Sequence, residues 1–164
     1  AELAQTKPND SLFFLPLTGG HREPATTEKG GFVGLQLSHN RAQMARAVME
    51  SAGYELHWAL QAVRAAGLPV AQLWMVGGAA QSPLWPHILA DITGLPIQLP
   101  QYDVWPALGA AILAGVGSDM YASAGEGQRL FRKTAVSITP NSDMHGAYQA
   151  QFQYYQQIRS RNLV

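Results

Sequence analysis

The residues best suited to contact a ligand lie in one stretch, QLWMVGGAAQSPLWPHILADITG, at positions 72–94. Gly77 and Gly78 follow the apolar run Leu73–Val76, and glycine has no side chain that would keep a ligand away from the backbone. The hydroxyl of Ser82 comes shortly afterwards. Ligands of open α/β sheets bind at the carboxyl ends of strands, so the pattern predicts a turn that contacts a ligand.

The composition of this turn favours a neutral, flat group over a phosphate. A phosphate-binding glycine loop usually includes a lysine, but residues 72–100 contain neither Lys nor Arg, and the glycine spacing departs from GxGxxG. A nucleoside base or a ribose is therefore the expected ligand group. The alternative is an ordinary strand-to-helix turn that uses glycine for its backbone geometry, and this stretch on its own favours that alternative.

Two elements would hold the turn in place. The run Leu73–Val76 is typical of a buried strand. A helix would follow, with Ser82 as its N-cap, Pro83 at its first position and Gly94 at its end. The apolar face of this helix consists of Leu84, Ile88, Leu89 and Ile92.

The longest predicted helix covers residues 41–66, with Ser38 or Asn40 as its cap. Its apolar face contains Ala45, Val48, Met49, Ala52, Leu56, Ala59, Leu60 and Val63. The opposite face contains Gln43, Arg46, Glu50, Tyr54, His57, Gln61 and Arg64. Arg46 and Glu50 are one turn apart on that face, and we expect their pairing to give a small gain.

Short strands are predicted at Leu12–Leu15, 31–37, 96–100 and 134–138. The strand at 96–100 lies between prolines, which is typical of a sheet edge. Two further helices are predicted. Residues 105–116, nearly all apolar and rich in Gly and Ala, predict a thin helix buried against the sheet. The last helix starts near Asn141 and has an apolar face of Tyr148, Phe152, Tyr155 and Ile158.

Length and composition exclude several classes of protein. A chain of 164 residues predicts one domain. Eleven basic and eleven acidic residues leave no net charge, so neither nucleic acid nor an anionic membrane is an expected partner. The absence of Cys excludes disulfides, and the apolar runs are too short to span a membrane. Charged residues are only 13%, which suggests a partly covered surface and self-association; a cytoplasmic location is the default expectation.

No catalytic or metal-binding constellation is visible. The five histidines are scattered and lack the spacing of helical metal ligands, and Ser82 lacks the GxSxG context of a nucleophile. Asp91 follows His87 by one helical turn, which favours a contact on the helix surface over a catalytic dyad. Asp103 precedes a predicted helix, whose N-terminal dipole explains its presence. We therefore assign no catalytic residue and no metal ligand.

Four motifs in order resemble the carboxy-terminal domain of FGGY-family carbohydrate kinases, most closely the xylulokinase-like branch. They are FLPLTGGHREP, GGFVGLQLSHNRAQMARAVMES, LWMVGGAAQSPLWPHILADITGLPI and PALGAAILAGVG. The resemblance covers residues Ser11 to Gly117. It implies an α/β fold of the actin-like, ribonuclease-H-like ATPase class that lacks its first strands, with residues 1–164 as the single nucleotide-side domain and the amino-terminal domain absent.

The resemblance also implies a function. FGGY kinases transfer a phosphoryl group from ATP, with Mg²⁺, to a sugar or polyol hydroxyl, and the sugar contacts lie mainly in the amino-terminal domain. Carried over to this chain, Gly78 and Ser82 would touch the adenosine, while Gly77 and Ala79 would shape the turn. The catalytic aspartate of the family lies outside these motifs, so this piece is expected to be inactive alone. The alternative is a freestanding nucleotide-binding or interaction module without catalytic activity.

Two positions depart from the family pattern. Ala79 stands where the family has a third glycine, and alanine tolerates fewer backbone angles, so a slightly different turn is expected. Val104 stands where the family has a glutamate before the ALGAA helix, and the neighbouring Asp103 is the candidate substitute.

Overall fold

The computed structural model describes residues 8, 11–16, 30–100, 105–131 and 135–161. The predicted loop between the first two strands and the positions Asp103 and Val104 lie outside these described ranges. The elements, in chain order, are β1 (Phe13–Leu15), β2 (Gly31–Val33), α1 (Arg41–Ala65), β3 (Leu73–Trp74), the 3-10 helix η2 (Gly78–Gln81), α2 (Trp85–Thr93), β4 (Ile97–Pro100), α3 (Trp105–Gly117), α4 (Ala124–Phe131), β5 (Ala135–Ile138) and α5 (Ser142–Arg161).

The strands form two small sheets. β1 and β2 pair antiparallel, and a mixed sheet has the order β3-β4-β5, with β4 parallel to β3 and antiparallel to β5. The prediction of an edge strand at 96–100 is therefore wrong, because β4 is the central strand. Its prolines are tolerated there because Pro96 precedes the strand and Pro100 is its last residue.

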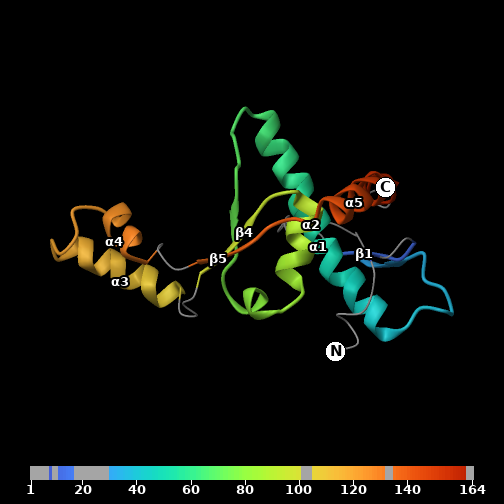
Figure 1. Ribbon diagram of the computed structural model, residues 1–164, viewed down its shortest axis with the longest axis horizontal. Helices are drawn as coiled ribbons and strands as arrows, with labels where there is room; N and C mark the ends of the chain where they lie inside the picture. Colours follow the sequence, from blue (N-terminus) through green and yellow to red (C-terminus); the bar gives the residue numbers. More distant parts are fainter. Residues whose placement is uncertain (1–7, 9–10, 17–29, 101–104, 132–134, 162–164) are drawn as a thin grey trace, which may run out of the picture.

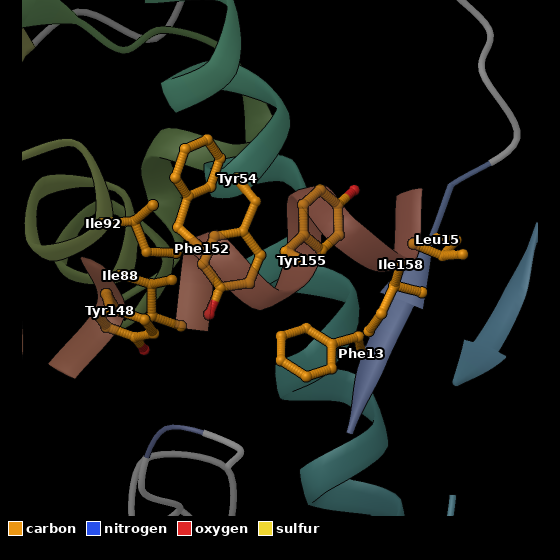
Figure 2. Close-up of a cluster of buried hydrophobic side chains, with 9 residues drawn as sticks. All are labelled: Phe13, Leu15, Tyr54, Ile88, Ile92, Tyr148, Phe152, Tyr155 and Ile158. Carbon is orange, nitrogen blue, oxygen red and sulfur yellow. The ribbon is translucent and has the colours of Figure 1, made fainter. Parts of the chain in front are cut away.

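Helices α1, α2 and α5 pack together with β1 around the main core (Figure 1). Figure 2 shows that this core joins side chains from the two ends of the chain: Phe13, Leu15, Tyr54, Ile88, Ile92, Tyr148, Phe152, Tyr155 and Ile158. The predicted apolar face of the last helix is confirmed, since all four of its residues are buried. A single glycine lets α1 and α2 approach closely, because a Cβ added at Gly53 would lie 2.5 Å from Cδ1 of Ile92.

The extent of α1 is confirmed, but the prediction of its buried face is wrong. Asn40 caps the helix in a capping box with Gln43, so of the two candidate caps Asn40 is the one used. The predicted polar face is the one that packs, and it buries Arg46, Glu50, Tyr54 and His57. Half of the predicted apolar face is exposed, including Val48 at 40%, although Leu60 from that face is buried.

Polar pairing across α1 and α5 explains this inversion. Arg46 Nε donates to Glu50 Oε1 at 2.7 Å, and its Nη2 donates to Tyr148 Oη at 2.8 Å. Tyr148 Oη in turn donates to Glu50 Oε1 at 2.8 Å. Burial, reinforced by the Glu50 charge, raises the pKa of Tyr148 and keeps the phenol protonated. Charged groups can occupy a core only when they are paired and hydrogen-bonded in this way.

Helix α3 also departs from the prediction. It was expected to be buried on the sheet, but it packs on α4, and Leu113 remains 66% exposed. In Figure 1 these two helices lie at the left, apart from the body formed by α1, α2 and α5. Contact within the pair is close, since a Cβ added at Gly127 of α4 would lie 2.8 Å from Cγ2 of Ile112 on α3. Among the described residues, no helix is long and apolar enough to cross a membrane.

Candidate functional site: an open turn between β3 and α2

The glycine turn lies directly between β3 and α2, as predicted, but its strand is shorter and less covered. β3 comprises Leu73–Trp74, although Met75 N–H still donates to the carbonyl of Gln98 in β4 at 3.0 Å. Trp74 and Val76 are 36% and 49% exposed. The prediction of a buried strand is thus wrong, because β3 is the end strand of its sheet in the described part of the chain.

The two glycines have different roles in the backbone. Gly77 has φ +83°, a left-handed value that side chains strongly disfavour, and it starts the reversal of the chain. Gly78 has an ordinary negative φ and begins η2, in which Ala80 N–H donates to Gly77 O at 3.0 Å. The turn therefore requires glycine for its conformation at position 77 but not at position 78.

The outer surface of the turn is open. Both Gly77 and Gly78 are exposed, and a Cβ added at either would meet no heavy atom within 4 Å. Ala79, the departure from the family pattern, is half-buried and has no positive φ, so alanine causes no strain there. At Gly78 a ligand could lie against the backbone, because glycine has no side chain that would fill this space.

Helix α2 begins two residues later than predicted. Its first residue is Trp85, with Pro86 in the first turn, so Pro83 is not the first helical position. The N-cap is Leu84, so the prediction of Ser82 at that position is wrong. Ser82 Oγ nevertheless accepts the N–H of Trp85 at 3.2 Å and that of Leu84 at 3.4 Å. A hydroxyl that accepts from the backbone keeps its own proton to donate. Ser82 can therefore accept from the first residues of α2 and donate to a ligand at the same time.

Sequence reasoning missed the environment of two polar groups on α2. The indole N–H of Trp85 is buried without a hydrogen-bond partner in the described chain, next to the turn. Asp91 was expected to contact His87 on the helix surface. Burial raises the pKa of the Asp91 carboxyl, and the His87 charge does act on this carboxyl by lowering its pKa to a smaller extent. In addition, Asp91 Oδ1 accepts the N–H of Asn141 at 2.8 Å. No spacing within one helix could indicate a partner that lies fifty residues away. The end of α2 at Gly94, which adopts the left-handed conformation, is confirmed.

Other parts of the described chain offer less chemistry. A shallow cavity of about 300 Å³ between α3 and α4 is lined mainly by small and apolar residues, with Gln128 as its one polar side chain. None of its lining residues is titratable. Within the described ranges, no group of three or more His, Asp or Glu side chains is placed to hold a metal ion. The turn between β3 and α2 is therefore the best candidate for a ligand site.

Comparison with known proteins agrees with the motifs. Residues 1–118 match the model of the FGGY family of carbohydrate kinases, C-terminal domain. The chain belongs to this family. The L-xylulose/3-keto-L-gulonate kinase of Escherichia coli (strain K12) is 34% identical over 152 residues, which are 93% of this chain and 30% of the relative. The xylulose kinase of the same strain is 38% identical over 113 residues, 67% of this chain and 23% of the relative.

Solved structures show the fold of these FGGY relatives. The chain superposes on a xylulose kinase from Rhodospirillum rubrum with a TM-score of 0.80 at 26% identity, covering 97% of this chain and 32% of that one. A gluconate kinase from Lactobacillus acidophilus gives 0.81 at 30% identity, covering 99% and 34%. The predicted actin-like, ribonuclease-H-like fold class is thus confirmed as a partial domain. The chain spans about 30% of the length of the curated relatives that match most of it.

Proposed function

We propose that residues 1–164 form the nucleotide-side, carboxy-terminal domain of an ATP-dependent carbohydrate kinase that phosphorylates a sugar or polyol hydroxyl. Membership of the FGGY family supports this assignment, and so do relatives that are named xylulose and gluconate kinases. The amino-terminal domain, with the catalytic base and most sugar contacts, would be a separate part of the full protein. This piece alone would bind nucleotide but would not transfer a phosphoryl group.

The turn at residues 77–82 would bind the adenosine part of ATP. The carrying observation is the open, uncharged surface at Gly78, where an added Cβ would meet no heavy atom within 4 Å. Gly78 would lie against the nucleoside, Ser82 would donate its hydroxyl proton to a base or ribose acceptor, and Gly77 and Ala79 would set the path of the backbone. A turn without basic residues suits the nucleoside better than the phosphates.

Phosphoryl transfer depends mainly on positioning and on charge stabilisation. In this scheme the described residues contribute the first of these, because they orient ATP from its adenosine end. Mg²⁺ would supply charge stabilisation at the phosphates, but no group of acidic side chains in the described chain fits it. We therefore assign Mg²⁺ to no residue here. We also propose a cytoplasmic location. The chain would self-associate through its exposed apolar surface.

The test is ATP binding by the full 164-residue chain, measured by titration calorimetry. Gly78→Val should weaken ATP binding by at least an order of magnitude, about 1.4 kcal/mol, because the valine side chain would occupy the space of the ligand. Gly146→Val is the matched control, since Gly146 is equally open but lies on α5. Thermal melts check that both variants fold. If the Gly78→Val chain folds and binds ATP with wild-type affinity, the turn does not bind adenosine and has only a structural role.

A further inference from the structure

The end of α2 is held by the beginning of α5. Asn141 precedes α5 and caps it, because its Oδ1 accepts the N–H of Asp143 at 3.0 Å and that of Met144 at 3.1 Å. The backbone N–H of Asn141 donates to Oδ1 of Asp91 on α2 at 2.8 Å. The carboxylate of Asp91 therefore lies at the N-terminus of α5, where the helix dipole favours a negative charge.

A second contact fixes the same part of α2. His145 Nδ1 lies 2.7 Å from the backbone carbonyl of Asp91, and since a carbonyl can only accept, the ring nitrogen donates. The His145 ring covers Gly94, where an added Cβ would lie 2.6 Å from its Cε1. Together, Asp91, Asn141 and His145 form what we call the α2–α5 clamp.

The other end of α2 carries the nucleotide turn. Ser82 and Trp85 join the turn to the first residues of the helix through the Oγ···N–H bond described above. Between the two ends, α2 has nine residues and packs on α1 through Ile88, Leu89 and Ile92. Apolar packing has no preferred direction, whereas hydrogen bonds fix distance and angle, so the clamp adds a directional restraint to this packing.

We propose that Asp91 is a positioning residue for the nucleotide turn, because its clamp to Asn141 and His145 fixes the axial position of α2. The inference rests on the proposed nucleotide-binding function of that turn. It adds a role for α5, which does not touch the ligand but would determine where the turn presents Gly78 and Ser82.

The test uses the full 164-residue chain and three variants. Asp91→Ala removes the acceptor, Asp91→Asn keeps an Oδ1 acceptor, and Arg159→Ala removes a bond of 3.0 Å that joins α5 to Glu55 on α1 rather than to α2. We expect Asp91→Ala to weaken ATP binding by about five-fold or more, roughly 1 kcal/mol, and to speed amide hydrogen exchange in residues 78–82. Asp91→Asn should stay within about two-fold of wild type, or 0.4 kcal/mol. Arg159→Ala should change only the melting temperature.

Two results would overturn the inference: a folded Asp91→Ala chain with unchanged affinity and exchange, or equal losses in Asp91→Ala and Arg159→Ala. If Asp91→Ala does not fold, His145→Ala replaces it, with the same two readouts and a smaller expected change. Failure of the wild-type chain to bind ATP would contradict the proposed function. Hydrogen exchange at residues 78–82 would then still show whether the clamp positions the turn.

Discussion

Helices α3 and α5 show opposite relations between composition and burial. α3 is almost wholly apolar, yet it leaves Leu113 66% exposed and has its described packing against α4. α5 is rich in Gln, yet Tyr148 and Tyr155 are completely buried. The apolar side chains of α5 form one stripe that meets α1 and α2, and its polar groups find partners there. A helix that is apolar on all sides is stable only when other elements pack on all of them. In the described structure α4 packs on one side of α3 and leaves the others exposed.

The comparison of α3 with α5 teaches that matched geometry, more than apolar content, determines burial here. The predictions below test the well-packed body against the exposed α3–α4 pair.

The largest effect is expected in the body, from Glu50→Ala. The change leaves Arg46 as a buried charge without its carboxylate partner, which typically costs about 3–5 kcal/mol of unfolding free energy. Urea unfolding followed by circular dichroism measures the loss. Glu126→Ala is the control in α4, where an exposed carboxylate accepts the N–H of Ala122. If both changes cost about the same, the distinction between the two regions is wrong.

Gly53→Ala should destabilise the chain by about 1–3 kcal/mol, because the new methyl group meets Ile92 in a core without free space. The same substitution at Gly146, on the open side of α5, should instead stabilise the helix by up to about 1 kcal/mol. Thermal melts of the two variants provide the comparison. A stabilised Gly53→Ala chain would show that the α1–α2 contact is looser than the structure indicates.

The body should also lose stability on mild acidification. Burial, followed by the Arg64 charge, lowers the pKa of His57 below its usual 6.5, so the folded chain holds this side chain neutral. Below pH 6.5 the unfolded chain binds the proton more readily, and the unfolding free energy should fall by about 1 kcal/mol between pH 7.5 and 5.5. His57→Leu should flatten that part of the profile, and an unchanged slope would exclude His57 as its cause.

The smallest effect on stability is expected in α3. Leu113→Glu should change the unfolding free energy by less than about 0.5 kcal/mol, as is usual for exposed positions. If α3 is a self-association surface, the same change should weaken association by about ten-fold or more, roughly 1.4 kcal/mol. Sedimentation at several concentrations measures this. A wild-type chain that remains monomeric throughout would contradict self-association itself.

Local features of the site and the fold followed from the sequence. The turn at Gly77 and Gly78, the helix end at Gly94 and the cap at Asn40 all depend on the backbone preferences of one or two residues. The apolar stripe of α5 depends only on spacing within one helix. Such signals are contained in short segments, and the family motifs added the fold class to them.

Tertiary structure alone decided the rest. Arg46 and Glu50 were predicted on the face opposite the apolar stripe, but Tyr148 from the other end of the chain makes their burial possible. Asp91 finds its partner in Asn141 for the same reason, and β4 is central because β5 returns beside it after two intervening helices. The backbone angles that require glycine for the conformation at position 77 but not at position 78 also emerged only in three dimensions. Each of these outcomes depends on contacts between segments that are distant in the sequence. The local pattern of residues cannot predict such contacts or their energies.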